Sequence, residues 1–266
     1  MSNVVKVGMT RPIVIVALAM VMSAMTGCGQ DPQGRAVADP QAEGWVEAPV
    51  IDKATREAEG LRVSGRAAAG SRIVLRGDLG TAFAIGTGDD GRFDLLVPSP
   101  DADTLYVLEV QAGEDAVPAA ARLLVSGDAA GPVALISPGS PTKRLDPGVG
   151  LDVVDSDGRT RIASGRAAAG QRVVIQVDAA EPVTVAADAE GRWTLNLGAI
   201  GAPSSSLIVD GVARVYPGEP GPEAPINRLM PSGRGTVLRW QISDTAQQSS
   251  WFADGGATGS ARLLDR

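Results

Sequence analysis

The sequence contains no histidine and only one cysteine, Cys28. Histidine is the commonest general base near neutral pH and the commonest metal ligand in proteins. A single cysteine cannot form an internal disulfide. The residue types that most hydrolytic and redox reactions need are therefore missing. The composition predicts a non-enzymatic protein with no catalytic residues, no cofactor and no metal.

Aromatic residues make up only 3% of the chain, and positive charge is also scarce relative to negative charge. The 24 Lys and Arg residues are outnumbered by 31 Asp and Glu residues, which gives a formal net charge of −7. The basic residues are scattered singly, and a protein that binds nucleic acid needs them clustered on one surface. We expect no nucleic-acid partner.

The N-terminus has the pattern of a processing segment. Lys6 and Arg11 precede an apolar run at residues 12–22, and no acidic residue occurs before Cys28. The run is shorter than the roughly 20 apolar residues that a spanning helix needs. Residues 25–28 read MTGC and resemble the lipobox of bacterial lipoproteins, although Met25 stands where leucine is commonest. The alternative is an ordinary secretory signal in which the cysteine is incidental.

The lipobox resemblance implies cleavage after residue 27 and acylation of the Cys28 thiol, so that the partner at this end is a membrane. Two or three acyl chains would anchor the protein firmly, at ~0.8 kcal/mol for each buried methylene. Gly29 is not the aspartate that is linked with inner-membrane retention in this family. The resemblance therefore implies the outer membrane, facing the periplasm, with exposure at the cell surface left open. Loss of Lys6 and Arg11 lowers the formal net charge from −7 to −9.

Two stretches 100 residues apart carry the same sequence. Residues 64–70 and 164–170 both read SGRAAAG, and each is followed by a β-branched run. The offset continues, because DGRFDL at residues 90–95 corresponds to EGRWTL at residues 190–195. The chain therefore contains an internal duplication, which defines its domain organisation before any residue is assigned a role.

Short alternating or β-branched runs are separated by Gly, Pro and Asp turns along the whole duplicated region, and no stretch has a helical period. This pattern predicts an all-β protein made of two tandem β-sandwiches. We expect the run at residues 133–136 to be the first strand of the second sandwich. The predicted parts are a signal peptide at 1–27, a flexible tether at 28–44, sandwich 1 at 45–127, sandwich 2 at 131–216, a C-terminal hairpin at 217–255 that packs on sandwich 2, and a frayed tail at 256–266.

The repeated elements resemble bacterial Ig-like domains, which occur in tandem on envelope and surface proteins. The resemblance rests on the strand, the stretch with two glycines and the β-branched strand around SGRAAAG, and on the acidic-Gly-x-aromatic turn. It covers about two thirds of the chain that follows the signal peptide. A carboxypeptidase-regulatory or transthyretin-like module would leave similar traces. The family implies a scaffold for spacing, adhesion and assembly, and a fold alone does not name a function.

Phe93 and Trp193 occupy equivalent positions in the two copies. In a chain so poor in aromatics, we expect each to be the largest side chain of its own sandwich core. A ligand-stacking role is the less favoured interpretation, because duplication preserved the bulk of both side chains.

Trp240, Trp251 and Phe252 lie outside the duplicated units, on the predicted C-terminal hairpin. If the hairpin covers the second sandwich, these side chains belong to a core, which is the interpretation we favour. If it does not, they form an exposed aromatic patch, and such a patch usually marks a partner site. They are the best candidate interaction surface in the sequence.

Two short motifs resemble functional motifs, and we interpret both as ordinary turns. RGD at residues 76–78 is the tripeptide that integrins recognise, but Gly-Asp after a strand is also an ordinary turn. DSDG at residues 155–158 resembles part of a calcium loop but lacks the spaced ligands and the distant glutamate. We interpret it as a hairpin turn.

The sequence thus predicts a membrane-anchored envelope lipoprotein that serves as a structural spacer or protein-interaction module. The alternative is an accessory protein that binds glycan or peptidoglycan through Trp240, Trp251 and Phe252. The envelope protein or glycan that it contacts is not specified by any motif.

Overall fold

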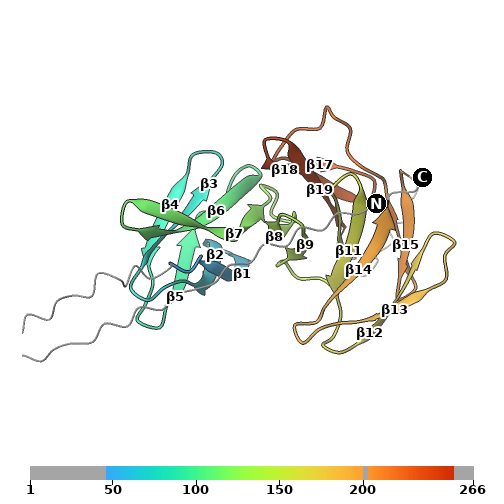
Figure 1. Cartoon of the computed structure of the whole chain (residues 1–266), viewed down its shortest axis with the longest axis horizontal. Coiled ribbons are helices and arrows are strands. Elements are labelled where there is room, and N and C mark those ends of the chain that lie inside the picture. Colours follow the sequence, from blue (N-terminus) through green and yellow to red (C-terminus); the bar gives the residue numbers. More distant parts are fainter. Residues whose placement is uncertain (1–45, 200–202, 255–266) are drawn as a thin grey trace, which may run out of the picture. The chain divides into compact units, whose positions relative to one another are not determined.

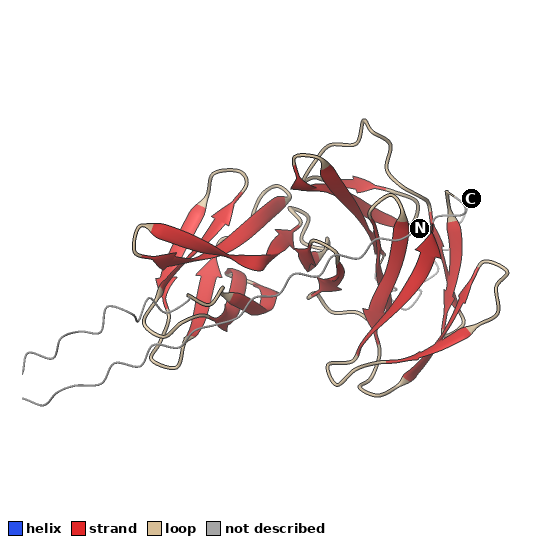
Figure 2. Cartoon of the chain, viewed as in Figure 1, coloured by secondary structure: helices blue, strands red, loops and turns tan. Residues whose placement is uncertain are grey.

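The structure, a computed structural model, describes residues 46–199 and 203–254. Every named element within those ranges is a β-strand, and turns and loops connect them (Figure 2). The described chain is therefore all-β, as predicted, and it contains no helix that could cross a membrane. The predicted signal peptide, Cys28, the tether at 28–44 and the tail at 256–266 lie outside the described residues.

The first sandwich is built from seven strands that form two antiparallel layers (Figure 1). One layer has the order β1-β2-β5, and the other contains β4-β3-β6-β7. Alternation on β5 buries Phe93, Leu95 and Val97 on one face, as the sequence pattern predicts. The strands are β1 (Val50–Glu57), β2 (Gly60–Arg66), β3 (Arg72–Gly77), β4 (Ala82–Gly86), β5 (Arg92–Val97), β6 (Thr104–Ala112) and β7 (Asp115–Val125).

The second sandwich repeats these seven strands. Its layers contain β14-β11-β10 and β13-β12-β15-β16. The strands are β10 (Gly150–Ser156), β11 (Thr160–Arg166), β12 (Arg172–Val177), β13 (Val183–Ala186), β14 (Arg192–Ala199), β15 (Ser205–Val209) and β16 (Val212–Tyr216). Each sandwich encloses a separate core, and the two cores share no residue. Each duplicated segment therefore builds a sandwich core of its own.

The duplication extends to an irregularity in the strands. A bulge interrupts the β1–β2 register between Ile51 and Lys53, and the equivalent bulge interrupts β10–β11 one hundred residues later. The bulged residue is an aspartate in both copies. Asp52 forms a bidentate ion pair with Arg66, with both N–O distances 3.0 Å. Its counterpart joins Asp152 to Arg166 at 2.6 and 2.8 Å. Both copies therefore hold the bulge with an Asp–Arg pair.

The connection between the sandwiches corrects one prediction. The run at residues 133–136 forms β8 (Val133–Ser137), which was expected to open the second sandwich. It instead pairs antiparallel with β7 and, with β9 (Ser140–Arg144), extends the larger sheet of the first sandwich. The reason lies in the repeat. Strand β10 begins 100 residues after β1, so the second copy starts at β10. Strands β8 and β9 lie before it and have no counterpart in the first copy. Their apolar composition alone did not show which strand they pair with.

The C-terminal strands join the second sandwich by main-chain pairing. They are β17 (Leu229–Pro231), β18 (Gly235–Ser243) and β19 (Ala246–Ala253). Strand β19 pairs with β10, so these strands widen one layer to the order β14-β11-β10-β19-β18-β17. The predicted hairpin is thus present, and it lies in the plane of the sheet.

Candidate functional site at the junction of the sandwiches

A third apolar cluster lies between the sandwiches, and it contains residues from both. Trp240 and Leu238 on β18 are fully buried in it, together with Phe252 on β19. The first sandwich and its β8 extension contribute Leu105, Leu124, Ala134 and Ile136, and β10 contributes Val153. The sandwiches therefore meet through a third core (the junction core) as well as through a covalent linker.

The C-terminal aromatics are buried, which agrees with the favoured interpretation and leaves no exposed aromatic patch as a candidate interaction surface. Trp240 and Trp251 have no exposed area, and Phe252 is 2% exposed. Trp251 packs in the second sandwich core, where its ring meets Tyr216 edge-on and its N–H donates to the carbonyl of Ser232 at 2.8 Å. These side chains are core residues because β19 pairs with β10. The C-terminal strands have no counterpart in the duplication, so comparison of the two copies could not predict this pairing.

Polar contacts reinforce the junction. The Arg228 guanidinium pairs with Asp78 at 3.0 Å, and the N–H of Leu229 donates to Asp103 at 2.9 Å. The guanidinium of Arg122 lies 5.9 Å from the centre of the Trp240 ring. Asp78 belongs to the RGD tripeptide, and its other oxygen accepts the N–H of Leu105. This carboxylate therefore has a structural role at the junction.

A buried carboxylate joins β9 to the second sandwich. Asp155 is 4% exposed and accepts the N–H of Thr142 at 2.7 Å, the Thr142 hydroxyl at 2.6 Å and the Ser250 hydroxyl at 2.6 Å. The Ser164 hydroxyl in turn donates to the carbonyl of Thr142. Both main-chain groups of Thr142 are therefore satisfied by side chains of the second sandwich. Burial raises the pKa of Asp155, although these hydrogen bonds favour its charged form.

The DSDG motif forms the β10–β11 turn, as predicted. Asp157 accepts the N–H groups of Arg159 and Thr160, and these hydrogen bonds lower the pKa of this carboxyl group. Asp155 instead belongs to the buried network at Thr142. The described residues contain no group of three or more carboxylates or other ligand side chains that could hold a metal ion.

Three arginines lie together beside this network. Arg144 is buried, pairs with Asp146 and donates to the carbonyl of Ala253 at 2.7 Å. Arg166 pairs with Asp152, as described above. Arg192 donates to the carbonyl of Arg144 at 3.1 Å. Burial, and then the positive charge of Arg166, lower the pKa of Arg192. Asp152, Asp188 and Glu190 act on Arg192 in the opposite sense, so neighbouring carboxylates balance the positive charge of the three arginines.

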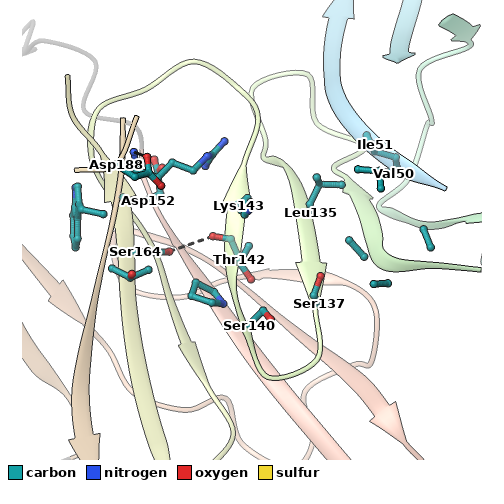
Figure 3. Close-up of a pocket in the computed structure, with 18 of the residues that line it drawn as sticks. Val50, Ile51, Leu135, Ser137, Ser140, Thr142, Lys143, Asp152, Ser164 and Asp188 are labelled. Carbon is teal, nitrogen blue, oxygen red and sulfur yellow. Dashed lines mark hydrogen bonds between the residues drawn. The ribbon is translucent and has the colours of Figure 1, made fainter. Parts of the chain in front are cut away.

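A cavity of about 530 Å³ opens at the junction. Its walls come from the start of β1, the middle of β7, the β8–β9 hairpin and the strands β10, β11 and β14. Figure 3 shows Val50, Ile51 and Leu135 on one side of the hairpin and Asp152 and Asp188 on the other. The volume lies within the range of about 300–1,000 Å³ that is typical of small-ligand sites. The cavity thus combines an apolar wall with a polar, charged wall.

The paired aromatics lie in the two sandwich cores. Phe93 is 4% exposed and Trp193 is 2% exposed, and each ring packs in the core of its own sandwich. Trp193 also lines the cavity. Its indole N–H is buried and has no hydrogen-bond partner among the described residues. The phenylalanine in the first copy has no such polar group.

Sequence reasoning did not identify the cavity. Lys143 lies in the Gly- and Pro-rich connection, and Ala119, Ala120 and Ala121 lie in an unremarkable alanine run. No spacing links these residues to Arg192. They come together only because β8 and β9 fold back on β7 and then meet the second sandwich. The repeat contained one sequence difference that bears on the cavity: Trp193, which lines it, occupies the position of Phe93 in the first copy.

Comparison with known proteins adds little. No family model matches the chain, and no curated protein matches it. A solved structure described as "Biofilm associated protein - BSP domain" aligns with 64% of this chain at 18% identity and a TM-score of 0.24. The aligned part spans only 28% of the length of that structure. A TM-score this low carries no argument about function.

Proposed function

We propose that this chain is a non-enzymatic, lipid-anchored lipoprotein of the bacterial envelope, and that its two sandwiches act as a stiff spacer and protein-interaction module. The junction core is the observation that carries this proposal. Cys28 in its lipobox-like setting supports the anchor and an outer-membrane position facing the periplasm.

Stiffness follows from the nature of the junction. Interfaces between domains of one chain are ordinarily polar, and relative motion is the default expectation unless the interface is large and hydrophobic. Here Trp240, Leu238 and Phe252 are buried against apolar side chains of the first sandwich. Hinge motion would expose that surface to water, at a cost of about 25 cal/mol per Å² of apolar area. The pair of sandwiches should therefore hold one arrangement, as a spacer must.

The glycan-binding alternative depended on exposed C-terminal aromatics. Trp240, Trp251 and Phe252 are buried, so they offer no face on which a sugar ring could stack. No other observation favours that alternative, and we do not propose it.

Replacing Cys28 with Ser tests the anchor. The Cys28→Ser protein should move from the membrane fraction to the soluble fraction, and metabolic labelling with a radioactive fatty acid should be lost. Met25→Leu, which introduces the residue commonest at that position of the lipobox, should stay membrane-bound. Unchanged fractionation of Cys28→Ser would show that the anchor is not a lipid on this cysteine.

Distance measurements test the spacer. Two spin labels can be attached through Asp89→Cys and Glu181→Cys, which lie in exposed turns of different sandwiches, in a Cys28→Ser background. Pulsed dipolar spectroscopy should give a single narrow distance distribution. A broad distribution would mean that the sandwiches move independently, and the spacer proposal would fail.

A further inference from the structure

The two sandwiches differ at one sheet edge. In the first sandwich, β8 follows β7, pairs with it and covers its edge. The strand order β3-β6-β7 of the first sandwich corresponds to β12-β15-β16 of the second, so β16 is the counterpart of β7. Among the described residues, β16 pairs only with β15 and is the last strand of its sheet. The second copy therefore lacks the cover that the first copy has.

The open edge of β16 presents main-chain groups. Residues 210–211 form a two-residue turn between β15 and β16, and both have positive φ, 47° and 80°. A turn of this kind is closed by a hydrogen-bonded pair, and such pairs alternate along an antiparallel ladder. The N–H and C=O groups of Ala213 and Val215 therefore point away from β15. In agreement, the carbonyl of Ala213 accepts the guanidinium of its neighbour Arg214 at 3.0 Å.

The side chains at this edge are apolar and exposed. Val212 is 51% exposed and Val215 is 60% exposed, and their spacing of three places them on opposite faces of the strand. The register makes Val215 the counterpart of Leu124 on β7, because Ser206↔Val215 corresponds to Leu105↔Leu124. Leu124 has no exposed area and pairs with β8. The first copy thus shows what covers this position, which is an antiparallel strand with apolar side chains.

The chain leaves the described region beside the end of β16. The N–H of Asp254 donates to the carbonyl of Arg234 at 3.2 Å. The next residue of that turn, Gly233, lies against Pro217, since a Cβ on Gly233 would be 3.4 Å from the proline ring. Pro217 directly follows β16. A segment that continues from Asp254 along this edge runs antiparallel to β16, as β8 does to β7.

The segment that follows Asp254 has a suitable length and sequence. Residues 255–266 can span up to about 40 Å when extended, whereas pairing along β16 needs only about 17 Å. Residues 261–265 read ARLLD, which differs at one position from ARLLV at residues 121–125. The latter segment is the end of β7, which pairs with strands on both sides. The two adjacent leucines of ARLLD would point to opposite faces of a strand.

We propose that residues 261–265 pair antiparallel with the open edge of β16, in the position that β8 occupies on β7. One leucine of this segment covers the face of Val212 and the other covers the face of Val215. This arrangement replaces the frayed tail that composition predicts. It is independent of the proposed function, and it closes a sheet edge that would otherwise be free to pair with another chain.

The test is site-resolved amide hydrogen exchange, measured by NMR on the full chain extracted in detergent. The reporters are the N–H groups of Ala213 and Val215. Both should exchange at least about tenfold more slowly in the full chain than in a variant that lacks residues 255–266, because each gains an interstrand hydrogen bond. Strand β13, at the opposite edge of the same sheet, is the internal control. Its amides should exchange alike in both proteins.

Substitutions in the tail separate strand pairing from a general effect of the deletion. Leu263→Asp and Leu264→Asp should each return the amides of Ala213 and Val215 to fast exchange, because a charge is unfavourable against an apolar edge. Thr258→Asp is the matched control, since it places the same charge in the tail outside ARLLD, and it should keep the slow exchange. Melting temperatures confirm that the variants are folded, because none of them alters a residue of the sandwich cores.

Three outcomes would overturn the inference. Equal exchange in the full chain and in the deletion variant would mean that the tail does not cover the edge. Slow exchange that is lost on dilution would show that a second copy of the chain pairs with β16. Slow exchange that requires an added envelope extract would assign the edge to a strand of another protein. None of these results bears on membrane anchoring by Cys28 or on the spin-label distances.

Discussion

The indole of Trp193 lies directly over the backbone of Gly165, its cross-strand partner on β11. A Cβ atom added to Gly165 would lie 2.7 Å from Cε2 of the ring and would also overlap the carbonyl oxygen of Gly150. The same relationship holds in the first copy, where a Cβ on Gly65 would lie 2.7 Å from Cζ of Phe93. The glycine in SGRAAAG is therefore required by two close neighbours, a main-chain carbonyl oxygen of the adjacent strand, which is the nearer, and the aromatic ring that packs on it.

Substituting this glycine should destabilise the second sandwich. Gly165→Ala forces a methyl group into occupied space, and overpacking of this kind typically costs about 1–3 kcal/mol. Urea denaturation followed by tryptophan fluorescence would measure the change. Gly86→Ala is the control, because a Cβ at Gly86 meets nothing within 4 Å. Equal stability of Gly165→Ala and the parent chain would contradict the packing described above.

Truncating the aromatic itself should be more damaging. Trp193→Ala should lower the free energy of unfolding of the second sandwich by about 3–5 kcal/mol, because it leaves a cavity in the core. Trp193→Phe should cost much less, since the first copy already holds Phe93 over the equivalent glycine. Calorimetric melting of the three proteins provides the comparison. An unaltered melt of Trp193→Ala would mean that the side chain does not support the core.

The junction core should couple the two sandwiches. Trp240→Ala removes its largest side chain, and we expect a loss of about 3–5 kcal/mol and a broader distance distribution between labels at positions 89 and 181. Val174→Ala is a suitable control, because Val174 is 45% exposed on the second sandwich and lies outside the junction core. If Trp240→Ala kept the narrow distribution, the junction core would not be what holds the sandwiches together.

The buried carboxyl group of Asp155 should make stability depend on pH. Its pKa is raised by burial, whereas an unfolded aspartate titrates near ~3.9. The native state therefore keeps the proton over a range in which the unfolded state has lost it. The free energy of unfolding should fall as pH rises from about 4 through the raised native pKa.

Asp155→Asn removes this titration. The stability of the parent chain relative to Asp155→Asn, measured by urea denaturation, should decline as pH rises from about 4 to 8. Asp157→Asn is the comparison, because hydrogen bonds lower the pKa of Asp157 and its contribution is lost only as pH falls through that lowered value. A difference between parent and Asp155→Asn that stays flat, or grows with pH, would show that Asp155 is ionised in the native protein throughout.

The sequence was sufficient for the all-β class, the duplication, the hairpin turn at Asp157 and the burial of alternate residues on β5. Each of these features follows from the local alternation of apolar and polar residues or from direct comparison of the two copies. Both kinds of information are present in a single sequence. Pairing between distant strands was not accessible in this way. The assignment of residues 133–136 to the second sandwich was wrong because an apolar run does not reveal which edge it pairs with.

Only the tertiary structure decided where the C-terminal strands go and what the linker encloses. Trp240, Trp251 and Phe252 could have been a surface or a core, and the pairing of β19 with β10 made them core. The junction cavity likewise brings together residues that lie far apart in the sequence, from Ala48 to Thr194. Local propensity acts over a few residues, whereas burial is a property of all the elements that meet at one place. For this reason the duplicated motif is enough to predict the two sandwiches, whereas the cavity between them could be identified only from the tertiary structure.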